Sequence, residues 1–120
     1  MSVLETATEV LDVFARSDIE RARALCAEEL LLFGTDVGEV WHDRESFLEA
    51  LEAMRELGLS ARWRETPIVA DGWVAGEAEF TFPDGRTLPV RVTLVFADGS
   101  LVHGHYSLAA DVADAPPRGR

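Results

Sequence analysis

The sequence predicts an α+β fold, in which three helices from the N-terminal half pack across the concave face of a curved, barrel-like antiparallel sheet that forms a cone. Two observations predict this class. Apolar residues recur at helical spacing, behind helix-capping patterns, within residues 2–58, whereas apolar and polar residues alternate in the second half. Three Asp-Gly pairs, which are strong signals for hairpin turns, divide that second half at residues 71, 84 and 98.

The first two helices are each predicted from a capping box, in which a Ser at the N-cap is followed three residues later by Glu. Ser2 and Glu5 begin a first helix of about 14 residues. Ser17 and Glu20 form the second box, and the second helix is expected to start at Ile19. The residues that this helix would bury are Ile19, Ala22, Leu25 and Cys26.

A short strand, a turn and a third helix follow. The apolar run at residues 30–33 breaks the helical period before Gly34 and predicts a buried strand. Residues 36–39 fit a turn, and residues 40–42 fit a short returning strand. Asp43 is the predicted N-cap of the third helix, and Gly58 is expected to end it. The apolar face of this helix would consist of Phe47, Ala50, Leu51, Met54 and Leu57.

The rest of the chain is predicted to form an antiparallel meander of four strands, at residues 60–70, 73–82, 87–97 and 100–109. Each strand would have one core face and one more polar face. The open end of a cone of this kind is a natural place for a ligand pocket. Residues 1–110 would then be a single domain, and residues 111–120 a flexible tail.

Charge and composition exclude several function classes. The 120 residues carry 22 acidic and 11 basic side chains, and the net charge of −11 argues against binding to nucleic acid or to anionic membrane. All the basic residues are Arg, which excludes a Schiff-base lysine, and no Gly-rich phosphate loop indicates a cofactor, so we expect none. The single Cys26 and the lack of a basic N-terminal segment predict a cytoplasmic location.

Several local patterns have a counterpart in a known family. A Gly-Thr-Asp stretch at residues 34–36 leads to Glu-x-Trp at 39–41, and a His-x-His-x-Ser strand at 103–107 follows the strand at 91–96. Together with the helix after Asp43, these patterns resemble the SnoaL-like domains of the nuclear transport factor 2-like superfamily, over residues 3–110. The resemblance implies a cone-shaped fold with a pocket between helices and sheet, and usually a homodimer. It names no function, because this fold hosts isomerases, cyclases, dehydratases, hydrolases and association modules.

One known mechanism of the superfamily fits the sequence poorly. Ketosteroid isomerases combine a base Asp with an oxyanion hole made of a Tyr and a protonated Asp. The only Tyr here is Tyr106, on the predicted last strand, and the inward positions of the preceding strand are the apolar Val90, Val92 and Leu94. The resemblance therefore implies an isomerase-, cyclase- or lyase-type acid–base catalyst of another arrangement, if the protein is an enzyme.

Asp36, His42 and Tyr106 are the candidate catalytic residues. Asp36 follows the buried strand near the mouth of the cone, and is either a general base or ligand contact, or a turn residue that organises residues 36–39. His42 is either a general base or a partly exposed loop residue. Tyr106 donates its hydroxyl hydrogen bond either to a ligand or to a helix carbonyl. The candidate ligand-binding side chains are Phe14, Phe33, Trp41, Trp63, Phe80 and Val92, of which the two Trp residues fit core packing equally well.

His103 and His105 lie two residues apart on a strand, so their side chains point the same way. One interpretation is a metal site, which would need Asp36 or His42 as a third ligand, and another is catalysis. We favour a third, in which both His residues and Arg91 lie on the outer sheet face, which commonly forms the dimer interface in the superfamily; no metal is then expected. The inward residues of this strand would be Val102, Gly104, Tyr106 and Leu108.

Two hypotheses about function follow. In the first, an apolar pocket binds or transforms a small hydrophobic, oxygen-bearing molecule by acid–base proton transfer. In the second, the protein is a non-catalytic association module that dimerises through the outer sheet face. A pocket that includes Asp36 would favour the first hypothesis, and a closed or very narrow cone would favour the second.

Overall fold

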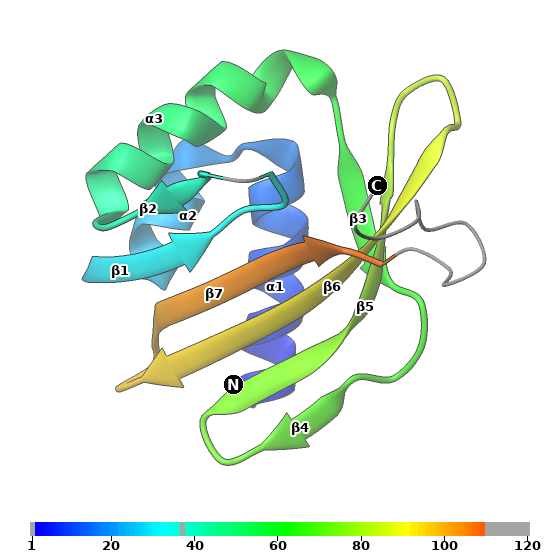
Figure 1. Cartoon of the computed structure of the whole chain (residues 1–120). Coiled ribbons are helices and arrows are strands. Elements are labelled where there is room, and N and C mark those ends of the chain that lie inside the picture. The colour runs from blue at the N-terminus through cyan, green and yellow to red at the C-terminus, as the bar shows by residue number, and fades with distance from the viewer. Residues whose placement is uncertain (1, 37, 110–120) are drawn as a thin grey trace, which may run out of the picture.

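The computed structural model describes residues 2–36 and 38–109, which fold into a curved sheet and three helices (Figure 1). The strand order of the sheet is β2-β1-β7-β6-β5-β3, and β4 pairs with β5. The predicted fold class is confirmed. The predicted flexible tail, residues 111–120, lies outside the described residues.

Helix α1 (Val3–Arg16) begins at the predicted capping box. The Ser2 hydroxyl accepts a hydrogen bond from the Glu5 backbone N–H (3.1 Å), and the Glu5 carboxylate accepts one from the Ser2 N–H (3.0 Å). These bonds satisfy two N–H groups that no helical carbonyl can reach. The buried residues of α1 pack against the inner face of the sheet: Ala7, Val10, Leu11, Val13, Phe14 and Ala15.

Helix α2 (Ile19–Leu25) starts where predicted, but its cap is one residue further on. Asp18, and not Ser17, is the N-cap, and its carboxylate accepts a hydrogen bond from the Arg21 N–H (3.2 Å). Ser17 instead ends α1 in the left-handed conformation (φ 56°). The N–H groups of Ser17 and Asp18 donate to carbonyls in the last turn of α1, at 3.2 and 3.1 Å, which is the Schellman arrangement. The two-residue connection between the helices therefore uses Ser17 for the end of α1 and Asp18 for the start of α2.

Helix α3 (Arg44–Met54) is capped by Asp43, as predicted, through a 2.8 Å hydrogen bond from the Ser46 N–H. A 3₁₀ turn (Arg55–Leu57) continues it. Gly58 then ends the segment with a positive φ of 64°, which glycine adopts without steric strain.

Strand β1 (Cys26–Phe33) is longer than predicted and includes Cys26, which was expected on α2. It pairs antiparallel with the short β2 (Val40–Trp41) and parallel with β7 (Ser100–Leu108). The sheet is therefore mixed and not purely antiparallel. The apolar run at residues 30–33 indicates a buried strand, but its periodicity carries no information on the direction of its neighbour.

The meander contains β3 (Ser60–Trp63), β4 (Ile68–Ala70), β5 (Trp73–Thr81) and β6 (Thr87–Ala97), followed by β7. All three Asp-Gly pairs lie in the hairpin turns between β4 and β7, as predicted. The strand expected at residues 60–70 is divided into β3 and β4, which pair with different parts of β5. Pro67 precedes β4, and proline has no N–H to donate to a sheet.

The core lies between the inner sheet face and the helices. Figure 1 shows α1 running behind β6 and β7, and α3 over the β1–β2 end of the sheet. On β7 the register shifts by one residue opposite Val95 and Phe96, so that Leu101 is buried and Val102 is not. Leu108, also expected to face inward, is 50% exposed at the strand end. Gly104 and Tyr106 face the core as predicted.

Candidate functional site

A pocket of about 250 Å³ lies where α1 ends, between α3 and the β5–β6 end of the sheet. It is somewhat smaller than the roughly 300–1,000 Å³ typical of small-molecule sites. Its apolar walls are formed by Phe14, Ala15, Leu32, Trp41, Phe47, Leu51, Met54, Leu57, Leu59, Phe80, Phe82, Leu88 and Val90. The other lining residues are Gly34, Thr35, Asp36, Glu39 and Tyr106.

Five of the residues predicted for the site line this pocket. Phe14 comes from the last turn of α1, Trp41 from β2 and Phe80 from β5. Asp36 and Tyr106 line the same pocket from segments far apart in the sequence. Their roles in binding or catalysis stay predictions.

The other four predicted residues lie outside this lining. Phe33 packs against His103 and His105, with ring centroids 5.8 and 5.5 Å apart, because its side chain points away from that of the inward Leu32. His42 is exposed at the bend before α3. Trp63 donates a 3.0 Å hydrogen bond from Nε1 to the Thr8 hydroxyl and thereby joins β3 to α1. Val92 is buried in the core cluster, and Val90, the preceding inward residue of β6, lines the pocket in its place.

The aromatic side chains of the pocket support one another. Phe47, on α3, contacts both Phe14 and Trp41, with ring centroids 4.8 and 5.4 Å apart in tilted and edge-to-face arrangements. Phe80 and Tyr106 form a second edge-to-face pair, at 6.3 Å. Such pairs contribute about 0.5–1.5 kcal/mol each beyond the burial of their surface. The walls are therefore held by ring contacts between α1 and α3, between α3 and β2, and between β5 and β7.

Exposed lining residues mark the opening of the pocket. Asp36 is exposed, and Leu57 is 45% exposed. The Glu39 carboxylate accepts a 2.9 Å hydrogen bond from the Asp36 N–H, and the Glu39 N–H donates to the Asp36 carbonyl (3.1 Å). Gly34 lies beneath Glu39, where a Cβ on Gly34 would be 2.8 Å from the Cβ of Glu39. The opening thus carries two carboxylates, one of them tied to the backbone of its own turn.

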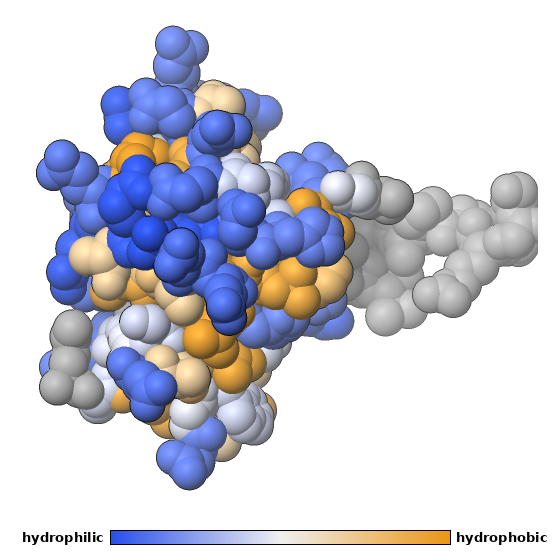
Figure 2. Space-filling view, turned by 90° about the vertical axis from the view of Figure 1, so that its left-hand side faces the viewer, coloured by the Kyte–Doolittle hydropathy of each residue, from blue (hydrophilic) through white to orange (hydrophobic). Residues whose placement is uncertain are grey.

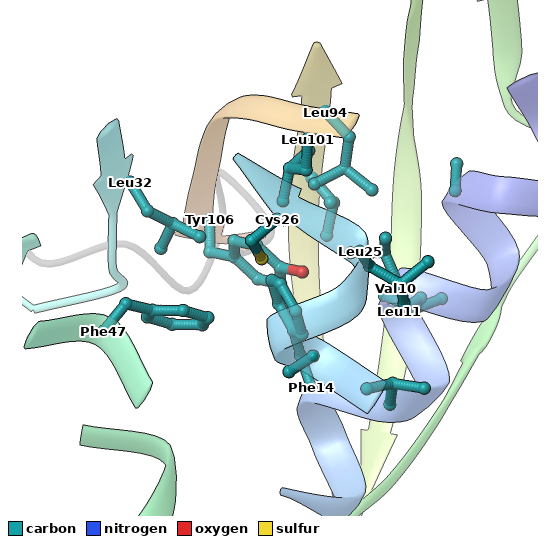
Figure 3. Close-up of a cluster of buried hydrophobic side chains, with 14 of the residues drawn as sticks. Val10, Leu11, Phe14, Leu25, Cys26, Leu32, Phe47, Leu94, Leu101 and Tyr106 are labelled. Atoms are coloured by element: carbon teal, nitrogen blue, oxygen red, sulfur yellow. The ribbon is translucent and has the colours of Figure 1, made fainter. Parts of the chain in front are cut away.

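Tyr106 carries a buried hydroxyl. It is 8% exposed, and its hydroxyl has no hydrogen-bond partner among the described residues. Figure 3 shows it among Phe14, Leu32 and Phe47, in the same cluster as Cys26. Burial, and secondarily the nearby Cys26 thiol, raise the pKa of Tyr106 far above its ordinary value of 10.0, so the hydroxyl stays protonated at neutral pH. Tyr106 is therefore an uncharged hydrogen-bond donor.

Cys26 has no sign of reactivity. It is buried, and burial raises the pKa of its thiol to about 12, with only a weak opposing effect of Arg44. A nucleophilic cysteine needs a depressed pKa and access to solvent. The sequence-based interpretation of Cys26 as a small buried residue agrees with this environment.

The outer sheet face collects the residues that were expected at a dimer interface. His105 pairs with Thr93 and is exposed, and Arg91, on the neighbouring strand, is exposed as well. His103 is half-buried beside Phe33. The side chains of these three residues lie on the face opposite the pocket, where Asp36 cannot join them. Within residues 2–36 and 38–109, no three His, Cys, Asp or Glu side chains converge as metal ligands do.

The sequence missed several lining residues. Phe47, Leu51 and Met54 could have been found, because helical spacing places them on one face of α3. Glu39 was expected in a turn and was given no role. Its position three residues after Asp36, in the same turn, is the signal that could have placed it at the pocket. Phe82 shares the face of Phe80 in the strand predicted at residues 73–82, which is the signal for it. Leu59 lies just outside the regular elements, where no periodicity indicates a direction.

Hydrophilic side chains surround smaller hydrophobic areas on the face shown in Figure 2, in keeping with the net charge of −11. In the described part of the chain, no helix has the length and apolar character needed to cross a membrane.

Solved structures with the same fold support the architecture. A candidate isomerase of the SnoaL-like family from Agrobacterium tumefaciens superposes with a TM-score of 0.74 at 16% identity, covering 89% of this chain and 97% of that one. A hypothetical protein with a ketosteroid isomerase-like fold from Catenulispora acidiphila, in complex with trimethylamine, gives 0.75 at 12% identity, covering 90% and 88%. A candidate calcium/calmodulin-dependent protein kinase II association domain from Xanthomonas campestris gives 0.66 at 22% identity, covering 89% and 81%. No curated protein matches the sequence.

The family itself is identified from the sequence profile of the SnoaL-like domain, which matches residues 7–103. This range includes the helices and most of the sheet, and it agrees with the resemblance expected from the local patterns. The protein therefore belongs to the SnoaL-like domain family.

Proposed function

We propose that the pocket binds a small, largely apolar molecule that carries an oxygen acceptor such as a carbonyl, and that Asp36 moves a proton next to that group. One observation carries the proposal: an apolar pocket that is lined by Tyr106, whose hydroxyl is buried and has no partner among the described residues, and by Asp36 at its opening. Apolar walls favour an apolar ligand by the hydrophobic effect. A buried hydroxyl without a partner is stabilised when a ligand oxygen accepts its hydrogen bond.

The division of roles follows from the two environments. Tyr106 stays protonated and donates a hydrogen bond, which stabilises negative charge that develops on a carbonyl oxygen during enolisation. Asp36 is exposed, and an ionised carboxylate is a competent general base for a proton on the adjacent carbon. His42 has no part in this proposal, because it lies outside the pocket lining.

The structural neighbours are consistent with a ligand-binding function. One carries the description of an isomerase, and another was solved in complex with trimethylamine. At these levels of identity the likeness concerns the fold, so the proposal rests on the residues of this chain.

A panel of small ketones, aldehydes and esters tests binding through the thermal unfolding of the wild type, Tyr106→Phe and Asp36→Ala. A ligand that binds the native state raises Tm. We expect Tyr106→Phe to retain or increase stability without ligand, because it removes a buried unpartnered hydroxyl, and to bind carbonyl ligands about tenfold more weakly. Asp36→Ala should retain binding and lose hydrogen–deuterium exchange at the carbon next to the carbonyl. If no compound raises the Tm of the wild type, the binding function is refuted. If Tyr106→Phe binds the carbonyl ligands as tightly as the wild type does, the role of Tyr106 is refuted.

A second candidate function is association through the outer sheet face. It is favoured by the exposed His105 and Arg91 and by the aromatic contact of Phe33 with both His residues, since aromatic and Arg side chains are enriched in interfaces. The candidate association domain from Xanthomonas campestris has the same fold. Sedimentation of the double variant His103→Glu, His105→Glu should show a monomer where the wild type is a dimer. A wild-type monomer, or a dimer in the variant, would remove this candidate.

A further inference from the structure

The pocket opening carries negative charge without a compensating cation. Both Asp36 and Glu39 line it, whereas no Arg or His is among its described lining residues. We infer that the pocket selects small uncharged molecules, about one ring in size, and rejects carboxylates of the same shape. This inference rests on the proposed binding function and adds a charge and size class to it.

The arginines of the described residues are placed elsewhere. Most of them are ion-paired on the surface, as Arg44 is with Glu45 (3.0 Å) and Arg86 with Asp84 (2.7 Å). Arg91 is exposed on the outer sheet face, opposite the pocket. A carboxylate ligand would therefore find no guanidinium in the described lining, although Arg is the usual partner of a bound carboxylate.

Three backbone N–H groups at the opening are already bonded within the turn. The Gly34 N–H donates to the Glu39 carbonyl (2.8 Å), the Asp36 N–H donates to the Glu39 carboxylate (2.9 Å), and the Glu39 N–H donates to the Asp36 carbonyl (3.1 Å). These amides are the groups that would otherwise bind an anion at a turn. The turn therefore uses them internally.

The negative charge at the opening is held in place. The hydrogen bond from the Asp36 N–H fixes the Glu39 carboxylate over Gly34, where glycine alone leaves room for it. Next to apolar walls, repulsion between this carboxylate and an anionic ligand is less screened than in bulk water. An anion that enters also loses its strong hydration, and the described lining offers it no cation in exchange. A neutral carbonyl compound is not repelled and loses less hydration.

The pocket volume indicates a ligand of modest size. About 250 Å³ is slightly below the range of typical small-molecule sites, and it admits a single six-membered ring with a short substituent. The aromatic contacts of Phe47 with Phe14 and Trp41 hold the walls at this spacing.

Two matched pairs of compounds test the inference: acetophenone against benzoate, and cyclohexanone against cyclohexanecarboxylate. Titration calorimetry at pH 7 should give at least tenfold tighter binding for the neutral member of each pair. Glu39→Gln keeps the oxygen that accepts the Asp36 N–H and removes one charge, so it should bind benzoate several-fold more tightly with little change for acetophenone. Glu52→Gln, which removes an equal charge at the exposed Glu52–Arg55 pair on α3, is the matched control and should leave both affinities unchanged.

The outcomes separate this inference from the proposed function. Equal binding of benzoate and acetophenone to the wild type overturns the charge selectivity and leaves small-molecule binding intact. A preference for acetophenone that Glu39→Gln leaves unchanged, or that Glu52→Gln reduces equally, also overturns it, because the local charge is then not the cause. If neither member of either pair binds, and the broader carbonyl panel raises no Tm, the proposed function itself is refuted.

Discussion

Replacing Ser17 with Gly is expected to stabilise the protein. Ser17 holds a left-handed conformation (φ 56°, ψ 44°) after the end of α1, where helices usually place glycine. It is 2% exposed, and its hydroxyl has no hydrogen-bond partner among the described residues. The hydrogen bonds that close the turn come from the backbone N–H groups of Ser17 and Asp18, so they survive the change.

The magnitude is the difference of three effects. The left-handed conformation costs a residue with a Cβ roughly 1 kcal/mol. Burial of an unpartnered hydroxyl costs about 1–2 kcal/mol more. Glycine avoids both, but the greater freedom of the unfolded chain offsets about 0.4–1 kcal/mol. The free energy of unfolding should therefore rise by about 1–2 kcal/mol, which for a domain of this length raises Tm by roughly 4–8 °C.

Urea unfolding followed by Trp fluorescence, together with thermal unfolding, measures the effect. Ser17→Ala is the matched control, because it removes the hydroxyl but keeps the Cβ, and its stability should lie between those of the wild type and Ser17→Gly. If Ser17→Gly is less stable than the wild type, the reasoning is refuted as a whole. If the Ala and Gly variants are equally stable, the backbone at this position is not strained.

Three further predictions concern single side chains. Because burial raises the pKa of the Cys26 thiol to about 12, its alkylation at pH 8 should be on the order of a thousand-fold slower in the native state than in urea, and equal rates would contradict the burial. Gly34→Ala should displace the Glu39 side chain, since its Cβ would lie 2.8 Å from that of Glu39, and should lower Tm; an unchanged Tm would show that the turn adapts freely. Hydrogen bonds from Arg21 lower the pKa of Glu9, so its contribution to stability is present at neutral pH and lost as the pH falls through the lowered pKa. Glu9→Gln should therefore reduce the loss of unfolding free energy between pH 6 and pH 3 in urea titrations, and an unaltered pH dependence would rule out a role for this pair.

Helix starts and hairpins were predictable because their signals are local. Ser2 and Asp43 cap the helices that they were expected to cap, and each Asp-Gly pair lies in a hairpin turn. A cap or a tight turn depends on a few neighbouring residues and on their backbone conformation. Ser17 was assigned to the wrong helix because two competing signals, the end of α1 and the start of α2, fall within two residues of each other.

The candidate site was predictable only in part. Strand alternation correctly directed Tyr106 and Phe80 inward, and the position of Asp36 after a buried strand brought it to the pocket opening. Val92 was chosen in place of Val90, because alternation gives both the same face and does not say which part of that face the helices cover. Phe33 was turned the other way by the pairing of β1 with β7, a contact between residues about seventy positions apart.

The sequence by itself determined the three helices and their order, the caps of α1 and α3, the hairpins, the strong negative charge and the family, since each depends on composition or on neighbouring residues. Only the tertiary structure decided that β1 lies parallel to β7, that Asp36 and Tyr106 share a pocket, and that His103 and His105 do not. It also placed two carboxylates at an opening whose described lining holds no cation. These features depend on where the helices pack along the sheet and on which strands pair. Both are decided by packing across the whole chain, which no local pattern encodes.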